Sequence, residues 1–168
     1  MRFAMIGCLG IAIAILGLAT PALSQNRPAI ESRFTSIASA DCVEVGNGGD
    51  EIDFVDYRCP GPNGMSVDLH FHDSLYLALG FNGTQVGSTM LSSNRPSNWL
   101  VDWRGRVENG VFRPLAAIVR VRDPDWSEDH SGSYLLVFGF GPHPCLLGER
   151  SGPRANAEAR TLADTGHC

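Results

Sequence analysis

The chain has 168 residues, a formal net charge of −5 and no lysine, so all 13 of its basic residues are arginines. This length is typical of one domain with a buried core. The acidic balance argues against nucleic acid and anionic lipid as partners. The absence of lysine excludes catalysis through a lysine Schiff base or a lysine general base. We predict no bound cofactor.

The N-terminus has the pattern of a secretory signal peptide. Arg2 precedes an uncharged apolar run over residues 3–18, which is too short for a stable membrane span. Ala22 and Ser24 place small residues where a signal peptidase reads the chain, so we predict cleavage after Ser24 and a periplasmic or secreted protein without a membrane span. The predicted organisation is a signal peptide over 1–24, a flexible leader over 25–33 and a single disulfide-linked, β-rich domain over 34–168.

Four cysteines follow the predicted cleavage site, an even number in a chain expected in an oxidising compartment. Three pairings are possible. We favour Cys42 with Cys59 and Cys145 with Cys168, because each pair closes a short local loop. A zinc site built from all four thiolates is a poorer interpretation, since the chain has no C-x-x-C pair.

The first half of the domain is rich in strand signals. Residues 42–45 and 52–59 alternate apolar and polar side chains around a Gly- and Asn-rich turn, which predicts a hairpin with a cysteine on each arm. Residues 65–73 and 75–81 predict two further strands. Residues 82–98 contain few apolar side chains and predict a long surface loop or a poorly paired edge.

The second half continues with strands. Residues 99–104 and 113–122 predict two strands around a turn region at 105–110. An acidic loop is expected over 123–132. Residues 134–140 form the most apolar strand, and residues 145–148 are expected to return beside it.

The tail changes to helical periodicity after Pro153. Arg160 and Asp164 are expected to face away from the apolar stripe, and Gly166 predicts a left-handed helix stop. The stripe consists of Ala155, Ala159, Leu162 and Ala163.

The predicted fold class is mainly β (α+β), with a single antiparallel, curled or barrel-like sheet of about 7–8 strands, one C-terminal helix and two disulfides.

One strand carries residues with metal-ligating side chains. Asp68, His70 and His72 alternate along residues 65–73, so they share one face. Two imidazoles and a carboxylate are able to ligate zinc or copper. The alternative interpretation is a solvated strand face whose opposite side, with Leu69 and Phe71, points into the core.

Three tryptophans are candidates for an interface or for the core. Trp99 and Trp103 share strand parity and are expected to face the same side, and Trp126 lies in the acidic loop. Large aromatic side chains dominate both protein cores and binding surfaces, so both interpretations stay open. The sequence has no G-x-S-x-G frame around a serine nucleophile.

Three segments carry a resemblance to a family of proteins. They are Tyr57-Arg58-Cys59-Pro60-Gly61, Cys145-Leu146-Leu147-Gly148 and the helical residues 155–164. With its terminal Cys168, the chain resembles a family of exported alphaproteobacterial proteins that has no assigned activity. The resemblance implies a periplasmic location and the same disulfide pattern.

A second resemblance is to periplasmic lysozyme inhibitors of the MliC/PliC type, which are small antiparallel barrels. Tyr57-Arg58-Cys59 and the strands over 65–81 are similar to that family, whereas its Ser-Gly-x-x-Tyr loop is one residue short at Ser131-Gly132-Ser133-Tyr134. No site residue is carried over.

These observations predict a non-catalytic periplasmic module that binds or inhibits a protein or a cell-envelope component. The first alternative is a metal-binding protein or hydrolytic enzyme that uses His70 and His72. The second alternative is a lysozyme inhibitor.

Overall fold

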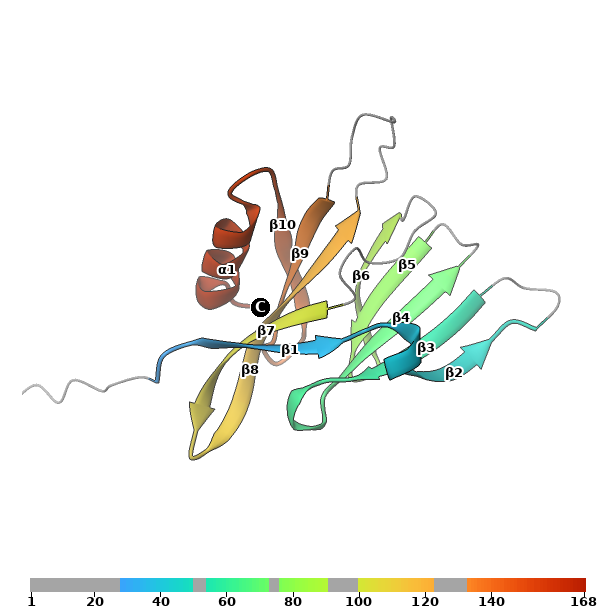
Figure 1. The fold of residues 1–168 in the computed structure, drawn as a ribbon, viewed down its shortest axis with the longest axis horizontal. Coiled ribbons are helices and arrows are strands. Elements are labelled where there is room, and N and C mark those ends of the chain that lie inside the picture. Colours follow the sequence, from blue (N-terminus) through green and yellow to red (C-terminus); the bar gives the residue numbers. More distant parts are fainter. Residues whose placement is uncertain (1–27, 50–53, 73–75, 91–99, 123–132) are drawn as a thin grey trace, which may run out of the picture.

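The computed structural model describes residues 28–49, 54–72, 76–90, 100–122 and 133–168. Within these ranges the chain forms two five-stranded sheets, one α-helix and two short 3-10 helices, η1 (Ser39–Asp41) and η2 (Pro62–Gly64) (Figure 1). Sheet A has the strand order β1 (Glu31–Ser36), β7 (Leu100–Glu108), β8 (Val111–Arg122), β9 (Ser133–Gly139) and β10 (Cys145–Ser151). Sheet B has the order β2 (Val43–Asn47), β3 (Phe54–Pro60), β4 (Ser66–His72), β5 (Tyr76–Phe81) and β6 (Thr84–Met90). The helix is α1 (Ala155–Thr165).

The mainly β class with a C-terminal helix and two disulfides is confirmed, but the single curled or barrel-like sheet is wrong. All neighbouring strands are antiparallel, and β2–β6 and β7–β10 are each a run of consecutive strands. β1 pairs with β7 over its whole length. It thereby occupies the edge of β7 that β6 would need in order to continue one sheet, and the chain divides into two sheets.

The expected flexible leader over 25–33 is too long by at least three residues, since β1 begins at Glu31. The turn expected over 105–110 is also shorter than predicted. β7 continues to Glu108, and β8 begins at Val111. The turn consists of Asn109 and Gly110, both with positive φ (53° and 78°), as in two-residue hairpin turns that match the strand twist. The segment 82–98 contains the edge strand β6, and its residues 91–98 lie outside the described residues.

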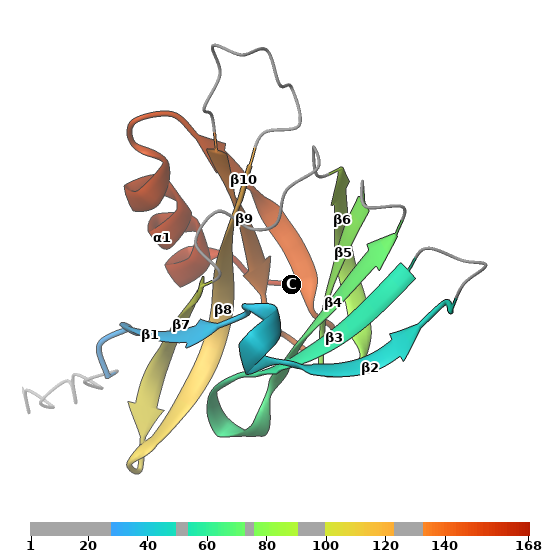
Figure 2. The same ribbon diagram turned by 45° about the vertical axis from the view of Figure 1, so that its right-hand side comes forward.

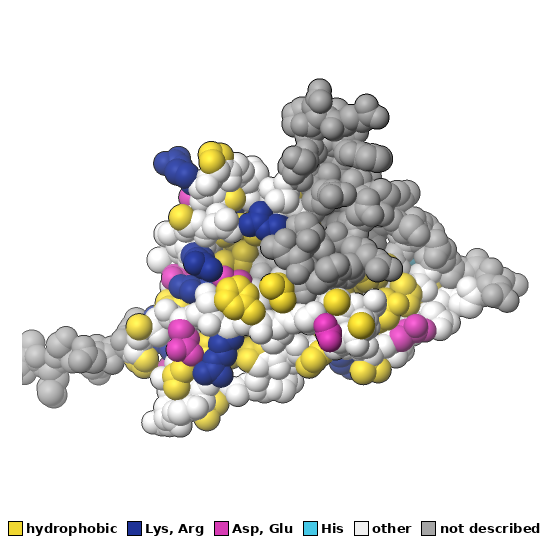
Figure 3. Space-filling view, viewed as in Figure 1, with side chains coloured by type: hydrophobic (Ala, Val, Ile, Leu, Met, Phe, Trp, Pro, Cys, Tyr) yellow, Lys and Arg dark blue, Asp and Glu magenta, His cyan; other side chains and the backbone are white. Residues whose placement is uncertain are grey.

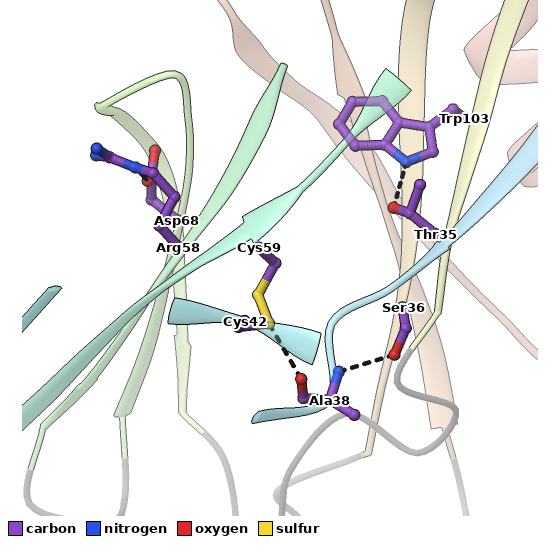
Figure 4. The surroundings of a disulfide bond; sticks show 8 residues. All are labelled: Thr35, Ser36, Ala38, Cys42, Arg58, Cys59, Asp68 and Trp103. Carbon is purple, nitrogen blue, oxygen red and sulfur yellow. Dashed lines mark hydrogen bonds and ion pairs between the residues drawn. A yellow bond between two sulfur atoms is a disulfide. The ribbon is translucent and has the colours of Figure 1, made fainter. Parts of the chain in front are cut away.

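The two sheets pack face to face around an apolar core (Figure 2). Trp103 is fully buried there, with its ring centroid 5.8 Å from those of Phe81 and Phe140. Its indole N–H donates a hydrogen bond to the Thr35 hydroxyl at 2.8 Å (Figure 4). Trp103 is therefore a core residue that also joins β7 to β1. Trp99 and Trp126 lie outside the described residues.

Helix α1 covers the face of sheet A that points away from sheet B, as Figures 1 and 2 show. Ala155, Ala159 and Ala163 are at most 4% exposed. Small side chains allow the helix axis to approach the sheet closely, so the predicted alanine stripe is the packing face. No described helix is long and apolar enough to cross a membrane.

Two expectations for this helix are wrong. Arg160 and Asp164 do not face away from the sheet, because their side chains reach back from the edges of the alanine stripe to Asp102 and Arg104 on β7. Gly166 is extended (φ −74°) rather than left-handed. A glycine is needed there for space, since a Cβ would lie 2.7 Å from the backbone oxygen of Leu162.

Both disulfides have the favoured pairing. Cys42–Cys59 joins the start of β2 to β3 and lies close to Ala38 (Figure 4). Cys145–Cys168 joins the start of β10 to the residues that follow α1. The loops they close separate the cysteines by 17 and 23 residues, which corresponds to roughly 3 kcal/mol each in the chain-entropy description.

Candidate functional site

The outer face of sheet B, which points away from sheet A, carries the polar residues that the sequence singled out on β4. Val67 and Leu69 are buried at 0% and 2% exposure and belong to the core. Because side chains alternate along a strand, Asp68, His70 and His72 lie on the opposite face. The predicted facing of this strand is confirmed.

The carboxylate of Asp68 binds an arginine side chain and does not point to the histidines as a free ligand. Arg58 is its direct cross-strand partner, and the Arg58 Nε donates to Asp68 Oδ1 at 2.6 Å. Asp68 Oδ2 accepts a hydrogen bond from the Gly83 backbone N–H at 2.6 Å. The carboxylate therefore fixes one edge of the guanidinium, beside which it lies in Figure 4. The two terminal nitrogens of Arg58 have no hydrogen-bond partner among the described residues.

His70 is oriented by a carboxylate in the same way. Its cross-strand partner on β3 is Asp56, and the Nδ1 atom contacts the Asp56 carboxylate. The ring of Phe54 lies 5.7 Å from the imidazole. In the neutral tautomer that donates from Nδ1, the Nε2 atom becomes an acceptor. The imidazole is 45% exposed, so it is held in place and still accessible to solvent.

These two pairs border a hollow of about 250 Å³ on the outer face of sheet B. Its floor includes Ala78, the cross-strand partner of His70, and Gly80, the partner of Asp68. Val45 and Gln85 also line it. Small residues on β5 leave the space that larger side chains would fill, and the polar side chains of β3 and β4 border it.

The structure does not assemble the predicted metal site. Within the described ranges no group of three or more His, Cys, Asp or Glu side chains is placed to hold a metal ion. The rings of His70 and His72 are 6.2 Å apart, and Asp68 is engaged by Arg58. Asp56 is the site residue that sequence reasoning missed. Its signal is the register of the β3–β4 hairpin, which pairs it directly with His70.

A second group of charged side chains joins α1 to β7. Basic and acidic side chains lie next to one another over α1 and β1 in Figure 3. The described members pair with each other, as in Arg104–Asp164 and Arg160–Asp102, so they serve the contact between layers. The loop on which the lysozyme-inhibitor hypothesis depends includes residues 131 and 132, which lie outside the described residues.

Comparisons with family models, with curated proteins and with solved structures find no significant match to this chain.

Proposed function

We propose that this chain is an exported, non-catalytic binding domain that takes a protein or a cell-envelope component on the outer face of sheet B. The N-terminal signal pattern and the two disulfides support export into an oxidising compartment. The difference between the two outer faces supports binding at sheet B.

That difference is the observation that carries the proposal. The outer face of sheet A is covered by α1, whose alanines pack on β8 and β9. In the part of the chain that the structure describes, no helix or strand covers the outer face of sheet B (Figure 2). This face instead carries two carboxylate-oriented polar side chains around a hollow. Fixed polar groups beside a concave surface are typical of recognition sites.

The Asp56–His70 pair supports hydrolysis as a second candidate, because a carboxylate that orients an imidazole is the arrangement of a general base. Covalent hydrolysis also needs a nucleophile within hydrogen-bond reach of that base. None of the described side chains that line the hollow is Ser, Thr or Cys. The site is therefore better suited to binding than to this chemistry.

Export is tested by mass spectrometry and N-terminal sequencing of the protein recovered from the periplasm of an expressing bacterium. We expect a chain that begins at Gln25, because Ser24 ends the predicted cleavage site. Recovery of the uncleaved chain from the cytoplasm alone would show that the export part of the proposal is wrong.

Binding is tested by co-sedimentation of the purified protein with washed cell envelopes of an alphaproteobacterium. Arg58→Gln and His70→Gln remove the two oriented groups, and Arg113→Gln is the matched control. Arg113 is a similarly exposed arginine that pairs with Glu108 on the β7–β8 hairpin. We expect both site variants to lose binding and the control to keep it. Equal binding by all four proteins would rule out this face as the site.

A further inference from the structure

We infer that the hollow on sheet B binds one unit of an uncharged glycan chain. This inference rests on the proposed function, since it names the ligand class of the same site. The inference follows from the hydrogen-bonding groups that line the hollow and remain accessible to a ligand.

The two carboxylates of the site are used to orient their neighbours. Asp68 accepts hydrogen bonds from Arg58 and from the Gly83 N–H, and Asp56 contacts His70 Nδ1. Their remaining capacity to attract a cationic ligand is reduced by these contacts. At the same time, two negative charges beside one guanidinium oppose the binding of an anion. Neither sign of ligand charge is favoured by this cluster.

The groups that remain for a ligand are mixed donors and acceptors. The terminal nitrogens of Arg58 donate, the Nε2 atom of His70 donates or accepts according to its tautomer, and the amide of Gln85 does both. A hydroxyl group is itself a donor and an acceptor. Several hydroxyls on one small ring therefore match this set, whereas a purely anionic or purely apolar ligand leaves part of it unpaired.

The shape of the site indicates a chain rather than a free small molecule. Arg58 and His70 are diagonal neighbours across β3 and β4, a relation that places them roughly 7–8 Å apart in a sheet. Their hollow of about 250 Å³ is smaller than the roughly 300 Å³ lower limit of pockets that enclose a drug-sized ligand. In the part of the chain that the structure describes, no helix or strand covers the sheet face around the hollow, which leaves space for a polymer to continue beyond it.

The test is binding of the purified protein to an immobilised panel of neutral glycans, which includes chains of N-acetylated aminosugars and chains of plain hexoses. The wild type, Arg58→Gln, His70→Gln and the control Arg113→Gln are compared. We expect at least one glycan to bind, with a loss of about tenfold or more in each site variant, as for a lost hydrogen bond to a charged or buried group. The control should bind like the wild type.

Salt and the envelope experiment separate the possible failures. Glycan binding should change little between about 0.05 M and about 0.5 M salt, because no net charge is matched. Strong weakening with salt would identify an anionic ligand and overturn the inference. Arg58-dependent envelope binding without any binding to the panel would overturn the glycan class and leave the proposed function standing. If substitution of Arg58 and of His70 changes neither envelope binding nor glycan binding, both the glycan inference and the proposed function are wrong.

Discussion

Arg104 and Asp164 join sheet A to α1 through two parallel hydrogen bonds. Arg104 Nε and Nη2 donate to the two Asp164 oxygens at 2.8 Å and 2.7 Å, and the side chains are only 12% and 27% exposed. The hydrogen bonds that Arg104 donates to Asp164 raise the pKa of Arg104, against the opposing effect of desolvation. Because the folded-state pKa is raised, this contribution to stability is fully present below the ordinary arginine pKa and is lost only at extreme alkaline pH.

We expect Arg104→Ala to lower the free energy of unfolding by about 2 kcal/mol, since it leaves the Asp164 carboxylate partly buried without its partner. The measurement is urea unfolding. Arg113→Ala is the control, because its pair with Glu108 is well exposed and such pairs contribute about 0–1 kcal/mol. The double variant Arg104→Ala, Asp164→Ala should cost less than the sum of the single variants. Equal losses for Arg104→Ala and Arg113→Ala would contradict a coupling role for this pair.

A second prediction at this scale compares neighbouring residues of β4. Leu69→Ala should destabilise by about 2–5 kcal/mol, because Leu69 is 2% exposed in the core between the sheets. His70→Ala should change stability by only about 0.5 kcal/mol, as is usual at exposed positions. Chemical denaturation of both variants checks the assignment. A larger loss for His70→Ala would mean that this histidine serves the fold, and it would weaken the case for a binding site.

At the scale of elements, the strands of the two sheets differ in pattern because they differ in what covers them. β4 alternates Val67, Asp68, Leu69 and His70, as expected for a strand with one face in the core and one in solvent. β8 and β9 are apolar in nearly every position of their central parts. Successive residues of β8 point to opposite faces, so that Ala117 faces the core and Ile118 faces α1. The apolar side chains on both faces of β8 and β9 are therefore explained by the helix that covers the outer face of sheet A.

The tight packing of α1 yields a prediction for two alanines of the same helix. Ala159→Leu should destabilise by about 1–3 kcal/mol, because residue 159 is fully buried against sheet A and has no room for three more carbons. Ala157→Leu is the matched control, since Ala157 is exposed and surface changes stay within about 0.5 kcal/mol. Thermal unfolding of both proteins provides the comparison. Similar stability of the two variants would indicate that the helix packs loosely on the sheet.

At the scale of the whole molecule, the chain forms three layers: α1, sheet A and sheet B. One disulfide lies at the core between the two sheets, and the other joins the residues after α1 to sheet A. Cys59 is completely buried in the core between the sheets, where Cys42 lies partly buried beside it. Cys168, near the end of α1, is exposed. Reagents in solution therefore have unequal access to the two bonds.

We expect mild reduction followed by alkylation to label Cys145 and Cys168 before Cys42 and Cys59, because thiol–disulfide exchange requires access to a sulfur atom. Peptide mass mapping over a time course gives the order. In concentrated urea the difference should disappear, which serves as the control for intrinsic reactivity. Earlier labelling of Cys59 in the folded protein would contradict its burial between the sheets.

The sequence by itself determined the features that depend on local patterns: the strands over most of their length, the alanine face of the helix, the facing of β4 and the favoured disulfides. The division into two sheets was decided only by tertiary structure, because it depends on β1 pairing with β7, a partner about 70 residues away. The same holds for Asp56 beside His70 and for Arg104 beside Asp164. Each of these pairs joins different strands or layers, and one-dimensional periodicity carries information about the face of a side chain but not about the residue that it meets across a sheet or between layers.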